Sequence, residues 1–585
     1  MNKRWIIKKQ GNQEAIDRLK SELGVDDYIA GLLVQRRMDT YDKARRFFRP
    51  SLSDLHDPFL MKDMDKAIKR LDSALENNEK ILVYGDYDVD GTTSVALIVS
   101  FLREYHRNIG FYIPDRYEEG YGISQKGIDY AYSNEFTLII ALDCGIKAID
   151  KVNYAKQKQI DFIICDHHLP GDELPDAYAI LDPKRPGDNY PFKELSGCGV
   201  GFKLIQAFAE HKDIPFSKLK QYLDLVVVSI ASDIVPITEE NRILAYFGLK
   251  RVNQTPRPGL EAILEFSNIK RREDQQKGNE YAFNKELTIS DLVFVVGPRI
   301  NAAGRMKDAK QSVELLTCDD KHFAHRLAQE INVNNDHRKE LDSSITGQAN
   351  RLISEGELYD KRKSIVIYNE NWHKGIIGIV ASRLIEKFYK PTIVLTLSNN
   401  NLITGSARSI KNFDIYNAIS SCSDLLVSFG GHKYAAGLSL KPENLDAFIE
   451  RFEKYASENI SAYQLVPEIE IDSELPLEAI TPKFFRILKQ FAPFGPGNMA
   501  PLFMTKNIVD NGYSKIVGKN HLKFKVIQPD NYDIQFSAIA FQQGHQFSNM
   551  NQMPFDICYH IEENIWNGNK TLQLNVKDIK FLNNS

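Results

Sequence analysis

Cysteine is scarce in this sequence, and its spacing excludes two classes of cross-linked protein. The six cysteines are scattered through 585 residues and contain no Cys-x-x-Cys pair. A disulfide framework or a zinc ribbon needs closely spaced cysteines, so neither is expected. The remaining interpretation is that the thiols are buried and reduced.

Long apolar runs are also missing. The longest, at residues 137–142 and 225–231, fall far short of the roughly 18 residues that a membrane span needs. The first residues, MNKRWIIKKQ, are basic but lack the apolar core of about 7 to 15 residues that a secretory signal carries. We therefore expect a cytoplasmic protein with no membrane segment.

Neither sign of charge dominates. The 74 Lys and Arg residues against 78 Asp and Glu residues give a net charge of −4, which predicts no polyanionic partner by itself. The first 50 residues are locally basic, with 12 Lys and Arg against 7 Asp and Glu. Such a cluster is more often a solvated face, and it supports nucleic-acid binding only if another site demands it.

The chain also lacks repeats of 20 to 50 residues, so a solenoid is not expected. Between about residues 80 and 180, the short apolar runs KILVYG, TLIIAL and IDFIIC alternate with helical stretches. Apolar runs without polar alternation are typical of strands buried on both faces. This pattern predicts a parallel α/β sheet.

The second half of the sequence predicts three further parts. Residues 321–355 lack proline and carry apolar residues at helical spacing, which predicts a long helix joining two domains. SIVIY, PTIVLTL and NLITGSA then mark a second, smaller α/β domain. HLKFKVIQ, IQFSAIAF and TLQLNVKDI are strand-like runs separated by turns, as in a small β-barrel such as an OB-fold.

Acidic residues follow the predicted parallel strands. KILVYG runs into Asp86, Asp88 and Asp90, TLIIAL into Asp143, and IDFIIC into Asp166, His167 and His168; Asp233 ends a buried helical stretch. Parallel sheets bind ligands beyond the carboxyl ends of their strands, so these loops should converge. The carboxylates would repel one another unless cations neutralised them. Oxygen ligands with one or two imidazoles favour manganese or magnesium over zinc.

These aspartates have two alternative interpretations besides a catalytic metal centre. A calcium loop of the EF-hand type needs a glutamate at its twelfth position, where this chain has Leu97, so calcium is disfavoured. Strand-end aspartates can also be solvated turns or helix caps. That interpretation fits a single Asp-Gly pair better than three such loops together.

These motifs resemble those of the DHH phosphoesterase superfamily. The order DYDVDG, DCG, DHH and SD matches its four successive metal-site motifs. DPFLMKDMDKAI, IPDRYEEGYG, GPRINAAGRM, GSARS, GGHKYAAG and PFGPGN extend the likeness over nearly the whole chain, to a branch of bacterial exonucleases that degrade single-stranded DNA from its 5′ end. GGHKYAAG looks like the substrate-binding signature of the DHH-associated carboxy-terminal domain.

The resemblance and the patterns above imply an α/β fold with a parallel-sheet DHH domain, a long connecting helix, a smaller α/β DHH-associated domain and a β-barrel (OB-fold) module. The expected segments are residues 1–60, a basic segment packing on the catalytic domain; 61–320, the DHH catalytic domain; 321–360, the connecting helix; 361–460, the DHH-associated substrate-binding domain; and 461–585, the OB-fold domain.

The resemblance also implies a two-metal centre that takes Mn²⁺ or Mg²⁺. Its ligands would be Asp86, Asp88, Asp90, Asp143, His167 and Asp233, with Asp143 between the ions, Asp88 on one, and Asp90, His167 and Asp233 on the other. Other members have a histidine where this chain has Tyr84. Of the two catalytic candidates, Asp166 would orient the histidine pair, and His168 would contact the phosphate or stabilise the departing oxygen.

Substrate contacts follow from the same resemblance. The expected residues are Arg116, Ser406, Arg408, Gly430, Gly431 and His432, with Arg299 or Arg305 reaching the same pocket. A guanidinium binds phosphate oxygens bidentately, and paired glycines let backbone amides approach closely. For any single arginine the alternative is a surface ion pair. In the barrel, Lys515, Lys519, Lys523 and Lys525 are the candidates for DNA-backbone contacts, whereas Phe524, Phe536 and Tyr559 are expected in the core.

The resemblance thus implies a processive, metal-dependent exonuclease that releases 5′-mononucleotides from single-stranded DNA in repair and recombination. It further implies a monomer that works with a single-stranded-DNA-binding protein and a helicase. One alternative is a phosphodiesterase for short oligoribonucleotides or cyclic dinucleotides, which would need neither the basic first segment nor the barrel. A binding scaffold with a decayed site is the other, but every expected metal position is present.

Overall fold

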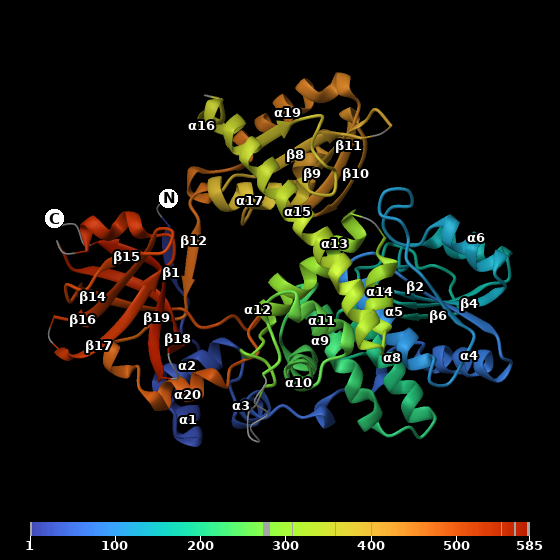
Figure 1. Cartoon of the computed structure of the whole chain (residues 1–585), viewed down its shortest axis with the longest axis horizontal. Coiled ribbons are helices and arrows are strands. Elements are labelled where there is room, and N and C mark those ends of the chain that lie inside the picture. The colour runs from blue at the N-terminus through green and yellow to red at the C-terminus, as the bar shows by residue number, and fades with distance from the viewer. Residues whose placement is uncertain are drawn as a thin grey trace. The chain divides into compact units, whose positions relative to one another are not determined.

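The computed structural model describes residues 3–272, 281–306, 308–356, 358–398, 400–529, 531–550, 553–566 and 569–581 (Figure 1). It forms two compact units: Met1–Ile6 with Val333–Glu470, and Ile7–Asn332 with Ile471–Ser585. Among the described helices, none combines the length and the apolar character that crossing a membrane requires.

The predicted parallel sheet is confirmed. Its five strands lie in the order β3-β2-β4-β5-β6, all parallel: β2 (Lys80–Gly85), β3 (Ile109–Tyr112), β4 (Phe136–Leu142), β5 (Asp161–Cys165) and β6 (Ala179–Leu181). The carboxyl ends of these strands therefore share one edge of the sheet.

Helices cover both faces of this sheet, as the unbroken apolar runs predict (Figure 1). In β2, Ile81 and Val83 join the core beneath α4 (Met64–Glu76), α5 (Val89–Leu102) and α8 (Gly197–His211). Leu82 and Tyr84 face the opposite core, which α6 (Gln125–Ser133) and α7 (Ile149–Gln157) complete. Burial on both faces fixes the strand register and thus the placement of the loops at their ends.

The long helix α15 (Lys321–Glu355) confirms the prediction of a connecting helix. Its first turns pack through Leu327 and Ile331 into the core of the parallel-sheet domain. Ile345, Ala349 and Ile353 pack into the core of the smaller α/β domain. One uninterrupted helix therefore contributes to both hydrophobic cores.

The smaller α/β domain has a five-stranded mixed sheet in the order β10-β11-β9-β8-β7. Its strands are β7 (Ile365–Tyr368), β8 (Thr392–Leu397), β9 (Ile403–Arg408), β10 (Leu426–His432) and β11 (Ala435–Leu440). Only β7 and β8 of this sheet pair in parallel. Helices α17 (Ile377–Phe388) and α19 (Leu445–Asn459) pack beside the sheet (Figure 1).

The last part of the chain is a closed β-barrel, as predicted. It is formed by β14 (Phe503–Asp510), β16 (His521–Gln528), β17 (Asn531–Ala540), β18 (Phe555–Trp566) and β19 (Asn569–Phe581), and pairing of β14 with β16 closes it. Phe524 and Tyr559 are buried in its core, and Phe536 packs partly against it.

The N-terminal helices pack differently from the prediction. Helices α1 (Gln13–Leu23), α2 (Asp27–Gln35) and α3 (Tyr41–Phe48) share one hydrophobic core with the barrel, not with the catalytic domain. Leu52 and Leu55, which follow these helices, pack against the core of the parallel-sheet domain. Sequence periodicity shows that α1–α3 each have an apolar face, but it does not show which part of the chain covers that face.

A buried arginine joins these parts. Arg242, in α10 (Glu239–Gln254) of the catalytic domain, donates to the carbonyl oxygens of Phe47, Gln490, Phe491, Ala492 and Pro493. Its guanidinium also lies 3.8 Å from the ring centre of Phe47. Catalytic domain, N-terminal helices and barrel therefore meet at one side chain.

Candidate metal centre and substrate site

The turn after β2 positions the first acidic group. Asp88 is the N-cap of α5, and its carboxylate accepts a hydrogen bond from the Gly91 amide at 3.0 Å. A Cβ on Gly91 would lie 2.3 Å from the Asp86 carbonyl oxygen, so only glycine fits this turn. Asp86 is fully buried and accepts a hydrogen bond from the Gly122 amide at 3.3 Å.

His167 lies at the centre of the acidic cluster. Its Nε2 atom is 3.2 Å from Asp143 Oδ1, 3.6 Å from Asp233 Oδ2 and 3.7 Å from Asp90 Oδ2. Both ring nitrogens are buried and without a hydrogen-bond partner among the described residues, as is Oδ2 of Asp86. Two groups of atoms are close enough to share a cation: Asp143, His167 and His168, and Asp90, His167 and Asp233.

Asp90 is held by residues that the sequence analysis missed. Its carboxylate accepts hydrogen bonds from the amides of Gly197 and Cys198, at 2.7 and 2.9 Å, and from the Ser229 hydroxyl at 2.7 Å. The two amides begin α8, whose N-terminus favours a negative charge. A Cβ on Gly197 would lie 2.6 Å from Asp143 Cβ, so the start of α8 can lie this close to Asp143 only because residue 197 is glycine. The glycine-rich run SGCGVG is the sequence feature that could have indicated this contact between a helix N-terminus and a carboxylate.

Asp166 and His168 form a hydrogen-bonded pair. Asp166 accepts from His168 Nδ1 at 2.8 Å and from the amides of Ile146, His167 and His168. Burial alone would raise the pKa of Asp166, but these donors and the histidine charge outweigh it and lower the pKa to about 2. Burial likewise opposes protonation of His168, yet the Asp166 carboxylate raises the net pKa of this histidine.

Four carboxylates of the cluster have raised pKa values. Burial, followed by repulsion from Asp88 and Asp90 respectively, raises the pKa of Asp86 and of Asp233 to about 8. Burial and neighbouring carboxylates also raise the pKa of Asp88 and Asp143, and burial lowers the pKa of His167. Ionised carboxylates around an unprotonated imidazole are the donor set that a hard divalent cation takes. The cluster and its orphaned buried atoms therefore fit such an ion.

The loop after β3 brings Arg116 and Tyr121 to the cluster. The Arg116 guanidinium lies 4.2 Å from the ring centre of Tyr87, between Asp86 and Asp88 in sequence. The Tyr121 hydroxyl donates to the Asp143 carbonyl at 3.1 Å and lies 3.2 Å from His168 Nε2. Tyr121 lies in the motif IPDRYEEGYG, but the sequence did not predict it as a site residue, because no local pattern distinguishes a functional tyrosine in a loop.

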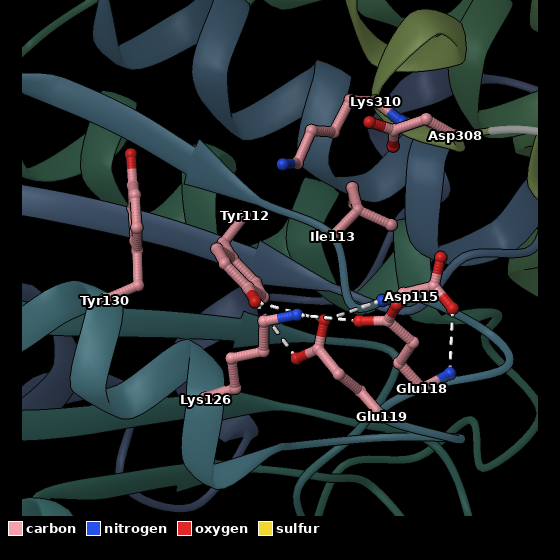
Figure 2. A pocket seen from close by; sticks show the side chains of 9 residues that line it. All are labelled: Tyr112, Ile113, Asp115, Glu118, Glu119, Lys126, Tyr130, Asp308 and Lys310. Carbon is pink, nitrogen blue, oxygen red and sulfur yellow. Dashed lines mark hydrogen bonds and ion pairs between the residues drawn. The ribbon is translucent and has the colours of Figure 1, made fainter.

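Glu119 stabilises this loop through hydrogen bonds. Its carboxylate accepts from the Tyr112 hydroxyl and the Asp115 amide (Figure 2). It also accepts from the Ser124 hydroxyl. Tyr112, Asp115 and Glu119 line part of a cavity of about 340 Å³ that Lys310 also faces (Figure 2). Glu118 pairs with Lys126 at 2.9 Å. Glu119 and Glu118 are thus engaged by neighbouring side chains and amides, and these contacts stabilise the conformation of the loop.

The two alternative arginines differ in placement. Arg299 is 8% exposed and donates to Asn332 Oδ1 at 3.0 Å and to the Val295 carbonyl at 2.9 Å. At Arg305, the backbone carbonyl accepts from the Tyr117 hydroxyl at 2.7 Å, which ties α13 (Gly297–Met306) to the Arg116 loop. Which arginine reaches a phosphate stays a prediction.

The compact unit that contains Val333–Glu470 brings together the predicted residues of the smaller α/β domain. Across β10, β11 and β9, Gly430 pairs with Gly437 and then Ser406, and His432 pairs with Ala435 and then Arg408. Arg408 donates to the Ser406 hydroxyl at 3.2 Å, and burial lowers its pKa. Gly431 has a φ of 145°, and a Cβ there would lie 2.4 Å from the Ala435 carbonyl. At Gly430 a Cβ would meet nothing within 4 Å, so packing does not require that glycine.

Comparison with known proteins agrees with this architecture. The chain matches the models of the DHH family, N-terminal domain, at residues 80–230, the DHHA1 domain at 361–458 and the RecJ OB domain at 471–578. It is 36% identical to the single-stranded-DNA-specific exonuclease RecJ of Bacillus subtilis (strain 168), over 98% of this chain and 70% of that protein. The chain belongs to the RecJ family.

Two further RecJ proteins extend the comparison. The RecJ exonuclease of Escherichia coli (strain K12) is 33% identical over 88% of this chain and 90% of its own length. The crystal structure of RecJ in complex with Mn²⁺ from Thermus thermophilus superposes with a TM-score of 0.82 at 26% identity, covering 99% of this chain and 79% of that one. The RecJ fold therefore extends through all the parts described above.

Proposed function

We propose that this protein is a single-stranded-DNA-specific exonuclease whose hydrolysis depends on two divalent cations, Mn²⁺ or Mg²⁺. Membership of the RecJ family supports the activity, since several relatives are named for it. The observation that carries the metal centre is the position of His167 Nε2: it lies buried within 3.7 Å of three carboxylates and has no hydrogen-bond partner in the part of the chain that the structure describes.

Six residues would hold the cations: Asp86, Asp88, Asp90, Asp143, His167 and Asp233. Cations bound in such a site lower the pKa of a water nucleophile and stabilise charge on the phosphate. Asp90, anchored by two amides and a hydroxyl, fixes one side of the cluster. Tyr121 and Asp166 orient His168, whose raised pKa suits a cationic donor to the scissile phosphate or the departing oxygen.

The finer features are proposals that come from the family resemblance. They are 5′-to-3′ polarity, release of 5′-mononucleotides, a role in repair and recombination, action as a cytoplasmic monomer, and cooperation with a helicase and a single-stranded-DNA-binding protein. Arg116, Arg305 or Arg299, and the group Ser406, Arg408, Gly430, Gly431 and His432 would contact phosphates. The shared strand register of Ser406, Arg408, Gly430 and His432 supports a common role for that group.

The deciding experiment digests single strands labelled at either end, with Mn²⁺, Mg²⁺ or EDTA. We expect labelled mononucleotide to appear first from the 5′ label, no digestion in EDTA, and little digestion of blunt duplex. First release from the 3′ label would contradict the polarity. A preference for cyclic dinucleotides or short oligoribonucleotides, assayed in parallel, would contradict the proposed substrate.

A further inference from the structure

Two large apolar side chains are exposed on elements that lie next to Asp233 of the metal cluster. Phe294 is 76% exposed, and Ile234, which directly follows Asp233, is 62% exposed. Both belong to the same compact unit as the cluster. Exposed apolar side chains that gather at one place on a folded protein mark a binding surface.

Ile234 adopts a backbone conformation that its own side chain disfavours. Its φ is 61°, in the left-handed region, which is a genuine outlier for a β-branched residue. It directly follows Asp233, the C-cap of α9 (Leu223–Ser232), at a position where helices usually have glycine. The chain thus keeps an exposed isoleucine where glycine would relieve strain, and such strain clusters at functional sites.

Phe294 lies in the middle of a π-helical turn, Leu292–Val296. Leu292 and Val296 are buried, and Val293 and Val295 are partly buried against the same core, which leaves Phe294 directed to solvent. Turns of this kind are rare and occur frequently at functional sites.

The π-helical turn lies against the end of α9. Gly297 follows the turn, and a Cβ there would lie 2.9 Å from Oγ of Ser232, the last residue of α9. The next residue, Asp233, reaches to within 3.6 Å of His167 Nε2. Phe294 and Ile234 are therefore carried by two elements that meet beside the cluster.

We propose that Phe294 and Ile234 form an apolar ledge against which nucleobases of the DNA strand lie next to the metal centre. This inference rests on the proposed function and deepens it, because it names the part of the substrate that the site grips. Every base has an apolar face, so such a ledge holds a strand without regard to sequence. In a duplex the base faces are covered by stacked neighbours held in place by pairing, so the ledge favours a single strand.

Normal and abasic strands test the ledge directly, because they differ only in the group it would touch. Affinity is measured by fluorescence anisotropy in EDTA, using a short single strand and its counterpart with abasic residues at the 5′ end. We expect the wild-type protein to bind the abasic strand about tenfold more weakly, the loss typical of one base–aromatic contact. Phe294→Ala should bind both strands equally, and Phe294→Trp should restore the preference.

Ile234→Gly provides a second, independent measurement. Relief of the strained φ should raise the melting temperature, whereas loss of the side chain should weaken binding of the normal strand about threefold. The matched control is Tyr132→Ala: Tyr132 is 57% exposed, but it precedes β4, at the sheet edge opposite to Asp143. This variant should bind like the wild type.

Equal wild-type affinity for both strands, or a preference retained in Phe294→Ala, would overturn the ledge. Unchanged affinity in Ile234→Gly would remove Ile234 from it. Because binding is measured without hydrolysis, the two proposals fail separately. A base preference without Mn²⁺-dependent digestion contradicts the proposed function, and digestion without a base preference contradicts the ledge.

Discussion

His167 and Asp143 approach to 3.2 Å between Nε2 and Oδ1, although they follow different strands and the imidazole has no hydrogen-bond partner among the described residues. Buried polar atoms are almost always paired, because leaving one unpaired costs about 1 to 3 kcal/mol. At 3.2 Å, His167 Nε2 and Asp143 Oδ1 are close enough to bind one cation together. Replacing either atom should therefore affect metal binding more than folding.

Asp143→Asn should lower the rate of single-strand hydrolysis by about a hundred- to a thousandfold, the scale seen when a charge-stabilising group is removed. The fold should persist, because burial and neighbouring carboxylates already raise the pKa of Asp143. Mn²⁺-dependent digestion and a melting curve in EDTA provide the measurements. Asp150→Asn, at an exposed aspartate in the first turn of α7, is the control and should behave like the wild type. Normal turnover in a folded Asp143→Asn protein would refute its role.

Stability of the metal-free protein should fall as pH rises. Asp86 and Asp233 have pKa values of about 8 in the fold, above the ordinary aspartate value near 3.9. The folded state therefore holds more protons, so its advantage is complete below about pH 4 and is lost by about pH 8. Melting curves in EDTA from pH 5 to 9 should show a decline that Asp86→Asn reduces.

Added Mn²⁺ should reverse that decline. Cation binding requires ionised carboxylates, so the rise in melting temperature on adding Mn²⁺ should grow with pH. A stabilisation by Mn²⁺ that is equal at pH 5 and pH 8 would contradict a site built from Asp86 and Asp233.

Glu119→Gln should weaken substrate binding without removing the metal centre. Glu119 accepts hydrogen bonds from Tyr112, Asp115 and Ser124 and so fixes the loop that carries Arg116. We expect KM for single strands to rise several-fold, with little change in Mn²⁺ affinity. The adjacent Glu118→Gln removes only an exposed ion pair with Lys126 and is the matched control. Identical KM values for both variants would exclude the bracing role.

Arg242→Met should destabilise the junction between the catalytic domain, the N-terminal helices and the barrel. The change removes the Arg242 donor from the carbonyls of Phe47, Gln490 and Ala492, whereas those of Phe491 and Pro493 still accept from Asn498 Nδ2; we expect a cost of about 3 kcal/mol. Urea unfolding and limited proteolysis near residue 490 measure the effect. Lys250→Met, at an exposed position of the same helix, should leave both unchanged. Wild-type stability in Arg242→Met would show that the junction does not depend on this side chain.

Lys515 and Lys525 flank the exposed ring of Tyr513 on the barrel, at 5.6 and 5.3 Å from its centre. If they contact DNA phosphates, replacing both by alanine should reduce the salt dependence of single-strand binding by about 1.4 in log–log slope. Lys506→Ala, which removes a lysine paired with Glu474, is the control. An unchanged slope in the double variant would place the strand elsewhere.

Local patterns in the sequence were sufficient for the parallel sheet and for the helix Lys321–Glu355. Strands buried on both faces must be apolar throughout, and a helix of that length must lack proline, so each leaves a local trace. The convergence of Asp90, Asp143 and His167 could be predicted for the same reason, since parallel strands end at one edge of their sheet.

Only the tertiary structure decided which faces meet. The apolar faces of α1–α3 read the same whether they cover the catalytic domain or the barrel, and the structure assigns them to the barrel. The amides of α8 that hold Asp90 lie more than 100 residues along the chain from it. Ile234 and Phe294 look like ordinary core residues in sequence, yet a left-handed φ and a π-helical turn leave them exposed. The periodicity of a sequence indicates which side chains are buried. The residues that cover them depend on how distant segments of the chain pack together.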